Sequence, residues 1–83
     1  MDRIAALLDA LRRNPQNVRF VDLARICAHF FGPPRHSGGS HHVYRTPWAG
    51  DPRVNIQCGP AGKAKTYQVR QVLAAIDRLE KRP

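Results

Sequence analysis

The sequence has no long hydrophobic run, and nothing in it approaches the roughly 20 consecutive apolar residues that cross a bilayer as a helix. Its start, Met1-Asp2-Arg3, lacks the apolar region of a secretory signal. The two cysteines are too few for a disulfide scaffold and suit free thiols in a reducing compartment. We therefore expect a cytoplasmic protein without a membrane span.

Acidic residues are also scarce. The 83 residues include 6 Asp or Glu against 14 Lys or Arg, which gives a formal net charge of +8. Between Leu23 and Ile76 the only acid is Asp51, whereas the same stretch holds seven basic residues and all four histidines. Concentrated positive charge is typical of proteins that bind a nucleic acid or an acidic protein. The alternative is that the charge only keeps a small domain soluble.

The chain shows neither an internal repeat nor a low-complexity segment, and its length suits one domain, 1–83, with a small core. Apolar residues spaced three and four apart predict helices over 2–13 and 20–31. A third helix is expected over 67–80, with Thr66 as its cap.

The region between the second and third helices favours strands. The segments 41–46 and 53–58 read as an antiparallel pair, because apolar and polar residues alternate in the second of them. A short edge strand is expected at 34–36, after two prolines. The result is an α+β fold in which helices cover one face of a two- or three-stranded antiparallel sheet and leave the other face open.

Two histidines stand together in Gly38-Gly39-Ser40-His41-His42. Histidine both takes and gives a proton near neutral pH, and glycine lets a bulky substrate approach the backbone closely. Cations surround this segment while carboxylates are scarce. That composition suits cleavage of a phosphodiester, with His removing the ribose 2′-OH proton and Arg or Lys stabilising the charged transition state. The alternative is that these are surface histidines without a catalytic role.

Metal binding is the rival use of histidine and cysteine. The candidate ligands are Cys27, His29, His36, His41, His42 and Cys58. None has the paired spacing of a structural zinc site. Both cysteines fall on apolar sides of their elements and are expected in the core. We therefore expect neither a metal nor another cofactor.

Lys63 and Lys65 stand just before the third helix. Positive charge there opposes the helix dipole unless an anion is bound, and backbone N–H groups at a helix start bind phosphate. The alternative is two solvated lysines. Trp48, in the loop between the strands, either stacks a base or packs against the hairpin.

The element Gly39-Ser40-His41-His42-Val43-Tyr44, with the basic hairpin, second strand and closing helix that follow, resembles the HicA-type toxins. These are the small ribonucleases of bacterial HicA–HicB toxin–antitoxin pairs. The resemblance covers residues 20–79 and leaves the helix at 1–13 as an addition. It implies a fold like a double-stranded-RNA-binding domain, in which a helix, three strands and a helix follow one another.

The resemblance also implies an activity. HicA-type toxins cleave mRNA without a metal through one histidine, which inhibits translation and growth, and a HicB-like antitoxin neutralises them. The catalytic histidine corresponds to His41, with His42 as second choice. If Val43 shares the apolar face of the second strand, His41 points inward with it. The residues expected to bind RNA are Arg35, Arg45, Arg53, Lys63 and Lys65. The alternatives are a non-catalytic RNA-binding module and a small partner-binding protein.

Overall fold

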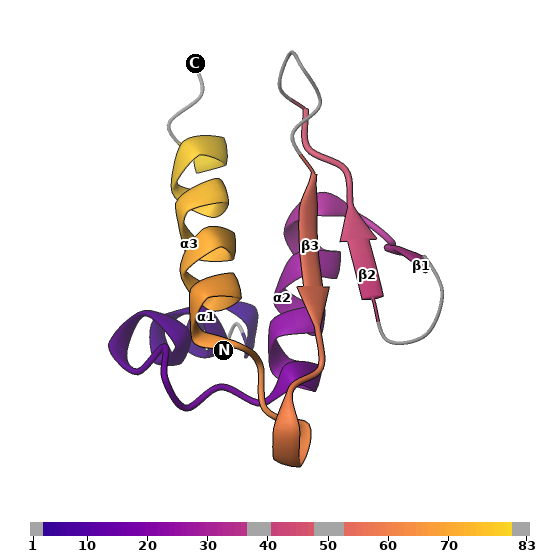
Figure 1. The fold of residues 1–83 in the computed structure, drawn as a ribbon. Helices are drawn as coiled ribbons and strands as arrows, with labels where there is room; N and C mark the ends of the chain where they lie inside the picture. Colours follow the sequence, from indigo (N-terminus) through magenta and orange to yellow (C-terminus); the bar gives the residue numbers. More distant parts are fainter. Residues whose placement is uncertain (1–2, 37–40, 48–52, 81–83) are drawn as a thin grey trace.

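The computed structural model describes residues 3–36, 41–47 and 53–80. In chain order its elements are α1 (Arg3–Arg13), α2 (Phe20–Phe31), β1 (Arg35–His36), β2 (His41–Tyr44), β3 (Val54–Gln57), a 3₁₀ turn (Pro60–Gly62) and α3 (Thr66–Glu80) (Figure 1). The expected α+β arrangement of helices on an antiparallel sheet is confirmed. No helix in this part of the chain is both long and apolar enough to span a membrane.

The sheet has the order β1-β2-β3, and both pairs of strands are antiparallel. The short edge strand is present as β1, where Arg35 lies opposite Val43. The two longer strands are shorter than the sequence predicts. β2 ends at Tyr44, two residues before Thr46, and β3 ends at Gln57.

The core lies between one face of the sheet and the two helices α2 and α3, which contact β2, β3 and each other. Side chains from all three parts are almost completely buried: Leu23, Ile26 and Cys27 of α2, Tyr44, Val54 and Ile56 of the sheet, and Val69, Val72 and Ile76 of α3. Burying one such large apolar side chain contributes about 1.5–3 kcal/mol. In Figure 1, α2 stands behind the sheet and α3 at its side.

Tyr44, rather than Val43, is the residue of β2 that faces the helices. Tyr44 is 1% exposed and its hydroxyl donates to the backbone oxygen of Ala24 at 3.4 Å. Burial raises the pKa of Tyr44 to about 12. The conditional expectation that Val43 and His41 point inward is therefore wrong. The larger tyrosine takes the inward position because its ring fills the core while its hydroxyl still reaches a hydrogen-bond acceptor.

The first helix, α1, packs on α2 and is joined to α3 by ion pairs. Leu11 is its one fully buried residue, at 2% exposure. The neighbouring Arg12 forms ion pairs with Asp77 at 2.8 Å and with Glu80 at 3.7 Å. These side chains are partly solvated, so each pair is worth at most about 1 kcal/mol. The apolar contact, and not the ion pairs, therefore supplies most of the stability of this packing.

The two cysteines differ in environment, which corrects the expectation that both belong to the core. Cys27 is buried, and its burial raises the pKa of the thiol to about 12. Cys58 is exposed. It follows the last residue of β3 and is joined to Ala64 by an isolated bridge, and its thiol donates to the carbonyl oxygen of Gly59 at 3.5 Å.

We expect a thiol reagent to distinguish the two cysteines. At about pH 8 the native protein should react quickly at one thiol, Cys58, and the second thiol should react only after unfolding, because only an accessible thiolate attacks the reagent. Stoichiometric labelling with and without denaturant measures this. Cys58→Ser should remove the fast reaction and Cys27→Ser should keep it. Fast labelling of both thiols in the native protein would contradict the burial of Cys27.

The raised pKa of Cys27 also has a consequence for stability. The stabilisation from keeping this thiol neutral is complete below the pKa of an unfolded cysteine, about 8.5. It is lost as the pH rises from there towards about 12, because only the unfolded chain then releases the proton. The Cys27→Ser variant should show a weaker loss of stability in that range.

Candidate nucleic-acid interface

One face of the sheet is turned away from the helices. Directly opposed residues of neighbouring strands share a face. The register places Arg35 opposite Val43, Val43 opposite Asn55, and His41 opposite Gln57. These five residues, Arg35, His41, Val43, Asn55 and Gln57, form what we call the open sheet face.

His41 contacts Asn55 across this face, with 3.4 Å between its Nδ1 and the side-chain oxygen Oδ1 of Asn55. An amide oxygen only accepts hydrogen bonds, so in the neutral ring this contact favours the tautomer with the proton on Nδ1. The other ring nitrogen, Nε2, then carries the lone pair. The contact with Asn55 thus orients the imidazole of His41 and favours the neutral form in which Nε2 can accept a proton.

His42 lies on the opposite side of the sheet, although it is adjacent in sequence. It is paired with the buried Ile56, and its ring meets that of Phe20 edge-on, with 5.0 Å between the ring centres. The structure thus separates the two candidate histidines. His41 faces outward beside polar groups, and His42 faces the helices beside apolar groups.

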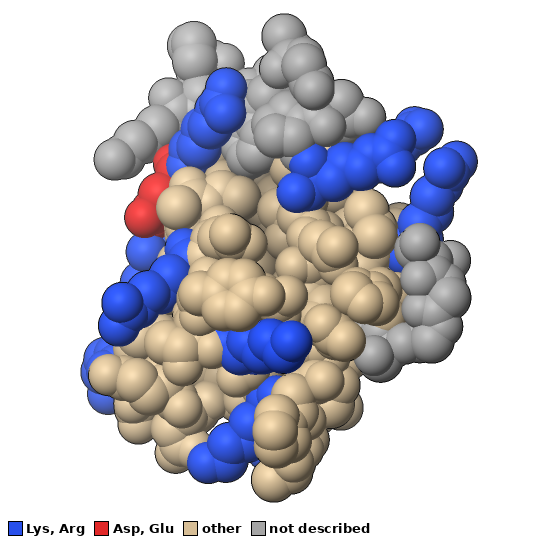
Figure 2. All heavy atoms as spheres, viewed as in Figure 1, with Lys and Arg blue, Asp and Glu red and all other residues tan. Residues whose placement is uncertain are grey.

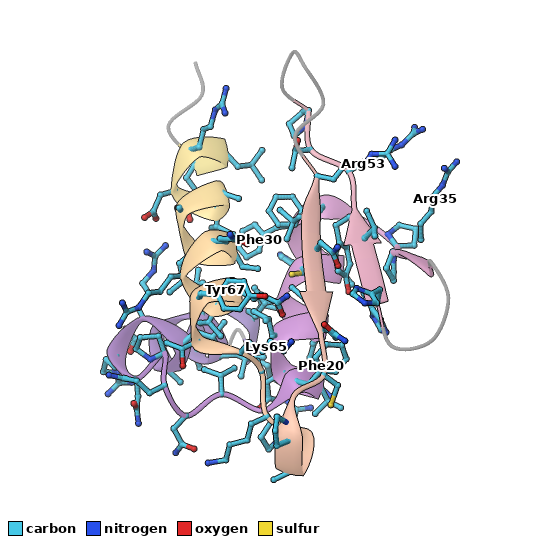
Figure 3. All side chains as sticks on the ribbon, in the orientation of Figure 1. Phe20, Phe30, Arg35, Arg53, Lys65 and Tyr67 are labelled. Atoms are coloured by element: carbon cyan, nitrogen blue, oxygen red, sulfur yellow. The ribbon has the colours of Figure 1, made fainter. Side chains whose placement is uncertain are left out.

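Three arginines expected to bind RNA are exposed along this side of the sheet. Arg35 belongs to the edge strand β1, Arg45 follows β2 and Arg53 precedes β3. In Figure 3 the side chains of Arg35 and Arg53 point away from the helices. Their guanidinium groups thus extend on the side of the sheet that carries His41, where a polyanion can reach them.

The structure separates the two lysines that precede α3. Lys65 Nζ donates to Gln57 Oε1 at 3.2 Å, which places its charge at the end of the open sheet face. Lys63 Nζ donates to Asn17 Oδ1 at 2.7 Å, and its backbone bridges to Arg19 at the start of α2. Amide oxygens hold both ammonium groups, so neither contact neutralises the positive charge.

A tight turn brings Lys65 back to the end of β3. The backbone N–H of Gly59 donates to the carbonyl oxygen of Lys63 at 2.8 Å. A Cβ on Gly59 would lie 2.8 Å from the same oxygen, closer than side-chain carbons approach in proteins. Glycine at this position therefore allows the chain to close the turn between the strand and α3.

Every carboxylate in the described part of the chain forms an ion pair with an arginine, on the helical side of the molecule. Asp9 pairs with Arg13 at 2.7 Å and Asp22 with Arg19 at 3.3 Å, while Asp77 and Glu80 share Arg12. Figure 2 shows the red acidic side chains at one place beside α3, whereas blue basic side chains are spread over the view. The described sheet is thus a basic surface without an acidic residue.

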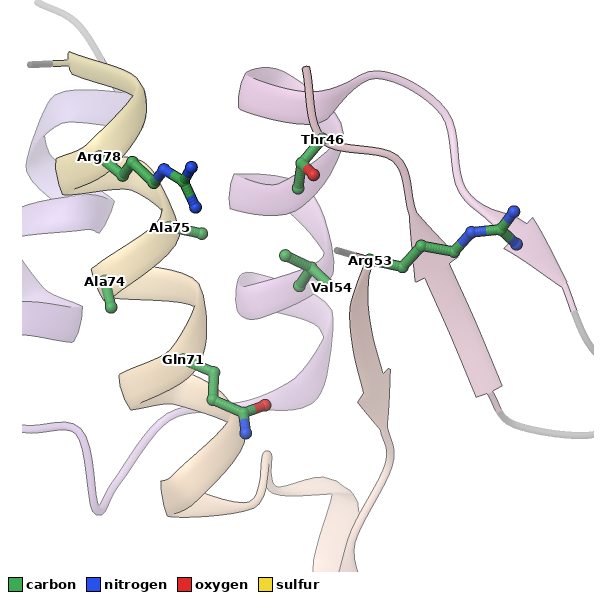
Figure 4. Close-up of a pocket in the computed structure, with 7 residues that line it drawn as sticks. All are labelled: Thr46, Arg53, Val54, Gln71, Ala74, Ala75 and Arg78. Carbon is green, nitrogen blue, oxygen red and sulfur yellow. The ribbon is translucent and has the colours of Figure 1, made fainter. Parts of the chain in front are cut away.

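A shallow groove of about 330 Å³ lies between α3 and the end of the sheet where β3 begins (Figure 4). Its lining residues are Thr46, Arg53, Val54, Gln71, Ala74, Ala75 and Arg78. Figure 4 shows Arg53 directed out of the groove and Arg78 directed towards the strands. Of the residues that line the groove, only Arg53 also lies on the side of the sheet that carries His41. The groove is therefore peripheral to that histidine.

Several polar residues of the site were not predicted as functional from the sequence. Asn55 and Gln57 alternate with the apolar Val54 and Ile56, and this pattern indicated only that they face outward. Gln68 gave no signal, because its position in a helix does not show which strand it contacts. It is 5% exposed, and its Oε1 accepts a hydrogen bond from the backbone N–H of Gln57 at 2.9 Å.

Parts of the predicted site lie outside the described residues, namely the Gly39-Ser40 segment and Trp48. Within the described ranges, no three His, Cys, Asp or Glu side chains are grouped so that they could hold a metal ion. Searches against protein-family models, curated proteins and solved structures found no match for this chain, so a function for the open sheet face must be inferred from its own residues.

Proposed function

We propose that this chain is an endoribonuclease that cleaves mRNA on the open sheet face, with His41 as its catalytic base. The observation that carries the proposal is the contact between His41 and Asn55 on a basic face without a described carboxylate. A nucleic acid is attracted to such a face, and the histidine is the group there that can remove a proton near neutral pH.

The proposed chemistry uses the neutral tautomer of His41 that carries its proton on Nδ1. Its Nε2 takes the proton of a ribose 2′-OH, and the 2′ oxygen attacks the adjacent phosphorus. The bond from phosphorus to the 5′ oxygen breaks and that oxygen takes a proton from water, while the protonated His41 returns its own proton to the solvent. The products are a 2′,3′-cyclic phosphate and a 5′-hydroxyl end. Lys65 and the arginines Arg35, Arg45 and Arg53 stabilise the negative charge that develops on the phosphate oxygens.

The order of the helices and strands also supports a ribonuclease function. Without α1, the chain runs helix, three antiparallel strands and helix, which is the order of a double-stranded-RNA-binding domain and of the HicA-type toxins. On this proposal the protein inhibits translation and growth. An acidic HicB-like antitoxin would neutralise it by covering the basic face, because opposite charges steer and align the partners.

Incubation of the purified protein with end-labelled RNA in excess EDTA tests this function. We expect cleavage products ending in 2′,3′-cyclic phosphate, and no cleavage of DNA of the same sequence, which lacks the 2′-OH. Expression of the chain in bacteria should arrest growth, and co-expression of the antitoxin should restore it.

Two outcomes would contradict the nuclease, and a third would contradict its independence of metal ions. Salt-sensitive RNA binding without any products would assign a non-catalytic RNA-binding module. No RNA affinity even at low salt, together with tight binding to an acidic protein, would assign a partner-binding role. Inhibition by EDTA would contradict the metal-independent chemistry.

A further inference from the structure

Tyr67 is a large aromatic residue that lies outside the hydrophobic core. It lies in the first turn of α3 and is 58% exposed. In the described part of the chain, the other large apolar side chain with comparable exposure is Val21, at 56%. Figure 3 shows Tyr67 and Lys65 at the same end of α3.

A chain of hydrogen bonds connects Tyr67 to the open sheet face. Gln68 Nε2 donates to the hydroxyl of Tyr67 at 3.4 Å, and Gln68 Oε1 accepts from the backbone N–H of Gln57 at 2.9 Å. Gln57 in turn holds Lys65 and lies opposite His41 in the sheet. Tyr67 and Lys65 are therefore each joined to the strand position beside His41 through the same residue, Gln57.

This arrangement has the components of a site for one nucleotide. A phenol ring held by its hydroxyl presents its apolar surface to solvent, where a nucleobase can stack on it. The ammonium of Lys65 supplies a charge for a phosphate of the same strand. Stacking on a protein ring requires that the base leaves its neighbours in the helix, which costs less free energy in single-stranded RNA than in a duplex.

We propose that Tyr67 stacks a base of the nucleotide beside the scissile phosphate and that Lys65 holds its phosphate, which makes single-stranded RNA the substrate. This inference rests on the nuclease function proposed above and adds to it a residue that selects the form of the RNA.

The test uses binding without cleavage, in the full-length chain carrying His41→Ala. Fluorescence anisotropy with a short labelled RNA should show that Tyr67→Ala weakens binding by about 5- to 100-fold, the range for loss of one stacked base. Tyr67→Phe and Tyr67→Trp should keep the affinity, because both retain a ring. Val21→Ala is the matched control for removal of an exposed apolar side chain and should also keep it.

The salt dependence of binding separates the two proposed contacts. Lys65→Gln should reduce the slope of log affinity against log salt by about 0.7, the value for one phosphate of a single strand. Tyr67→Ala should leave this slope unchanged while lowering the affinity. A blunt duplex of the same sequence should bind more weakly than the single strand.

Three results would overturn the stacking site while leaving the nuclease function in place. These are unchanged affinity in Tyr67→Ala, an equal loss in Tyr67→Phe, which would assign a role to the hydroxyl alone, and equal binding of the duplex. Thermal unfolding of each variant checks that it is folded. Failure of the unmodified protein to cleave RNA would instead refute the proposed function itself.

Discussion

Replacing His41 with alanine is expected to lower the rate of RNA cleavage by about 10²- to 10⁴-fold, the usual contribution of a general base. The loss should be large because the open sheet face offers no second proton acceptor among its described residues: Asn55 and Gln57 are amides, and Arg35 is a permanent cation. Cleavage is measured by gel electrophoresis of end-labelled RNA, and expression of the variant should no longer arrest growth.

The variant should remain folded, which makes the result interpretable. His41 is half-buried, and its hydrogen bond to Asn55 is long, at 3.4 Å. Losing one such bond costs about 1 kcal/mol or less. RNA affinity should therefore be retained while catalysis is lost.

Other histidines of the same chain supply the controls. His29→Ala, an exposed position on α2, should cleave RNA at the original rate. His42→Ala removes a ring that packs against Phe20, so it should lower stability more than activity. Full activity in the His41 variant would refute the assignment. Loss of activity in a folded His42 variant alone would transfer the catalytic role to His42.

The largest effect on stability is expected from Ile56→Ala. Ile56 is 0% exposed and lies on the side of β3 that faces α2 and α3. Removing its side chain should lower the free energy of unfolding by about 2–5 kcal/mol, from lost burial and from the cavity left behind. A chain of this size has a total free energy of unfolding of roughly 4–12 kcal/mol, so the variant should lose a large share of it.

Chemical denaturation followed by circular dichroism measures this change. Val21→Ala is the matched control, since it shortens another apolar side chain that is 56% exposed and should change the stability by at most about 0.5 kcal/mol. If Ile56→Ala cost less than about 1 kcal/mol, the core would not close around this strand as described.

The helices and strands could be predicted from local patterns in the sequence. The second helix was predicted at 20–31 and occurs there, because its apolar spacing and the Gly32-Pro33 stop are local signals that tertiary contacts do not override. The strands were also predicted from a local signal, the alternation of apolar and polar residues in 53–58. Their ends were predicted too far along the chain, since a strand ends where its partner ends, and the partner is not a local property.

Which side chains share the site could not be predicted in the same way, because it depends on strand register and helix packing. The inward position of Tyr44 turned Val43 and His41 outward, and one residue of register would have inverted all three. Neither the His41–Asn55 contact nor the path from Tyr67 through Gln68 to Gln57 follows from the sequence.

These contacts could not be predicted because the residues that form them lie far apart in the sequence. Contacts between β2, β3 and α3 join residues that no local spacing relates, so they are set by strand register and by the packing of α3 on the sheet. Composition alone already showed that the chain is basic, rich in histidine and poor in acids. Folding decided that His41 stands on the open sheet face with Lys65 near it, while His42 and Lys63 are directed elsewhere.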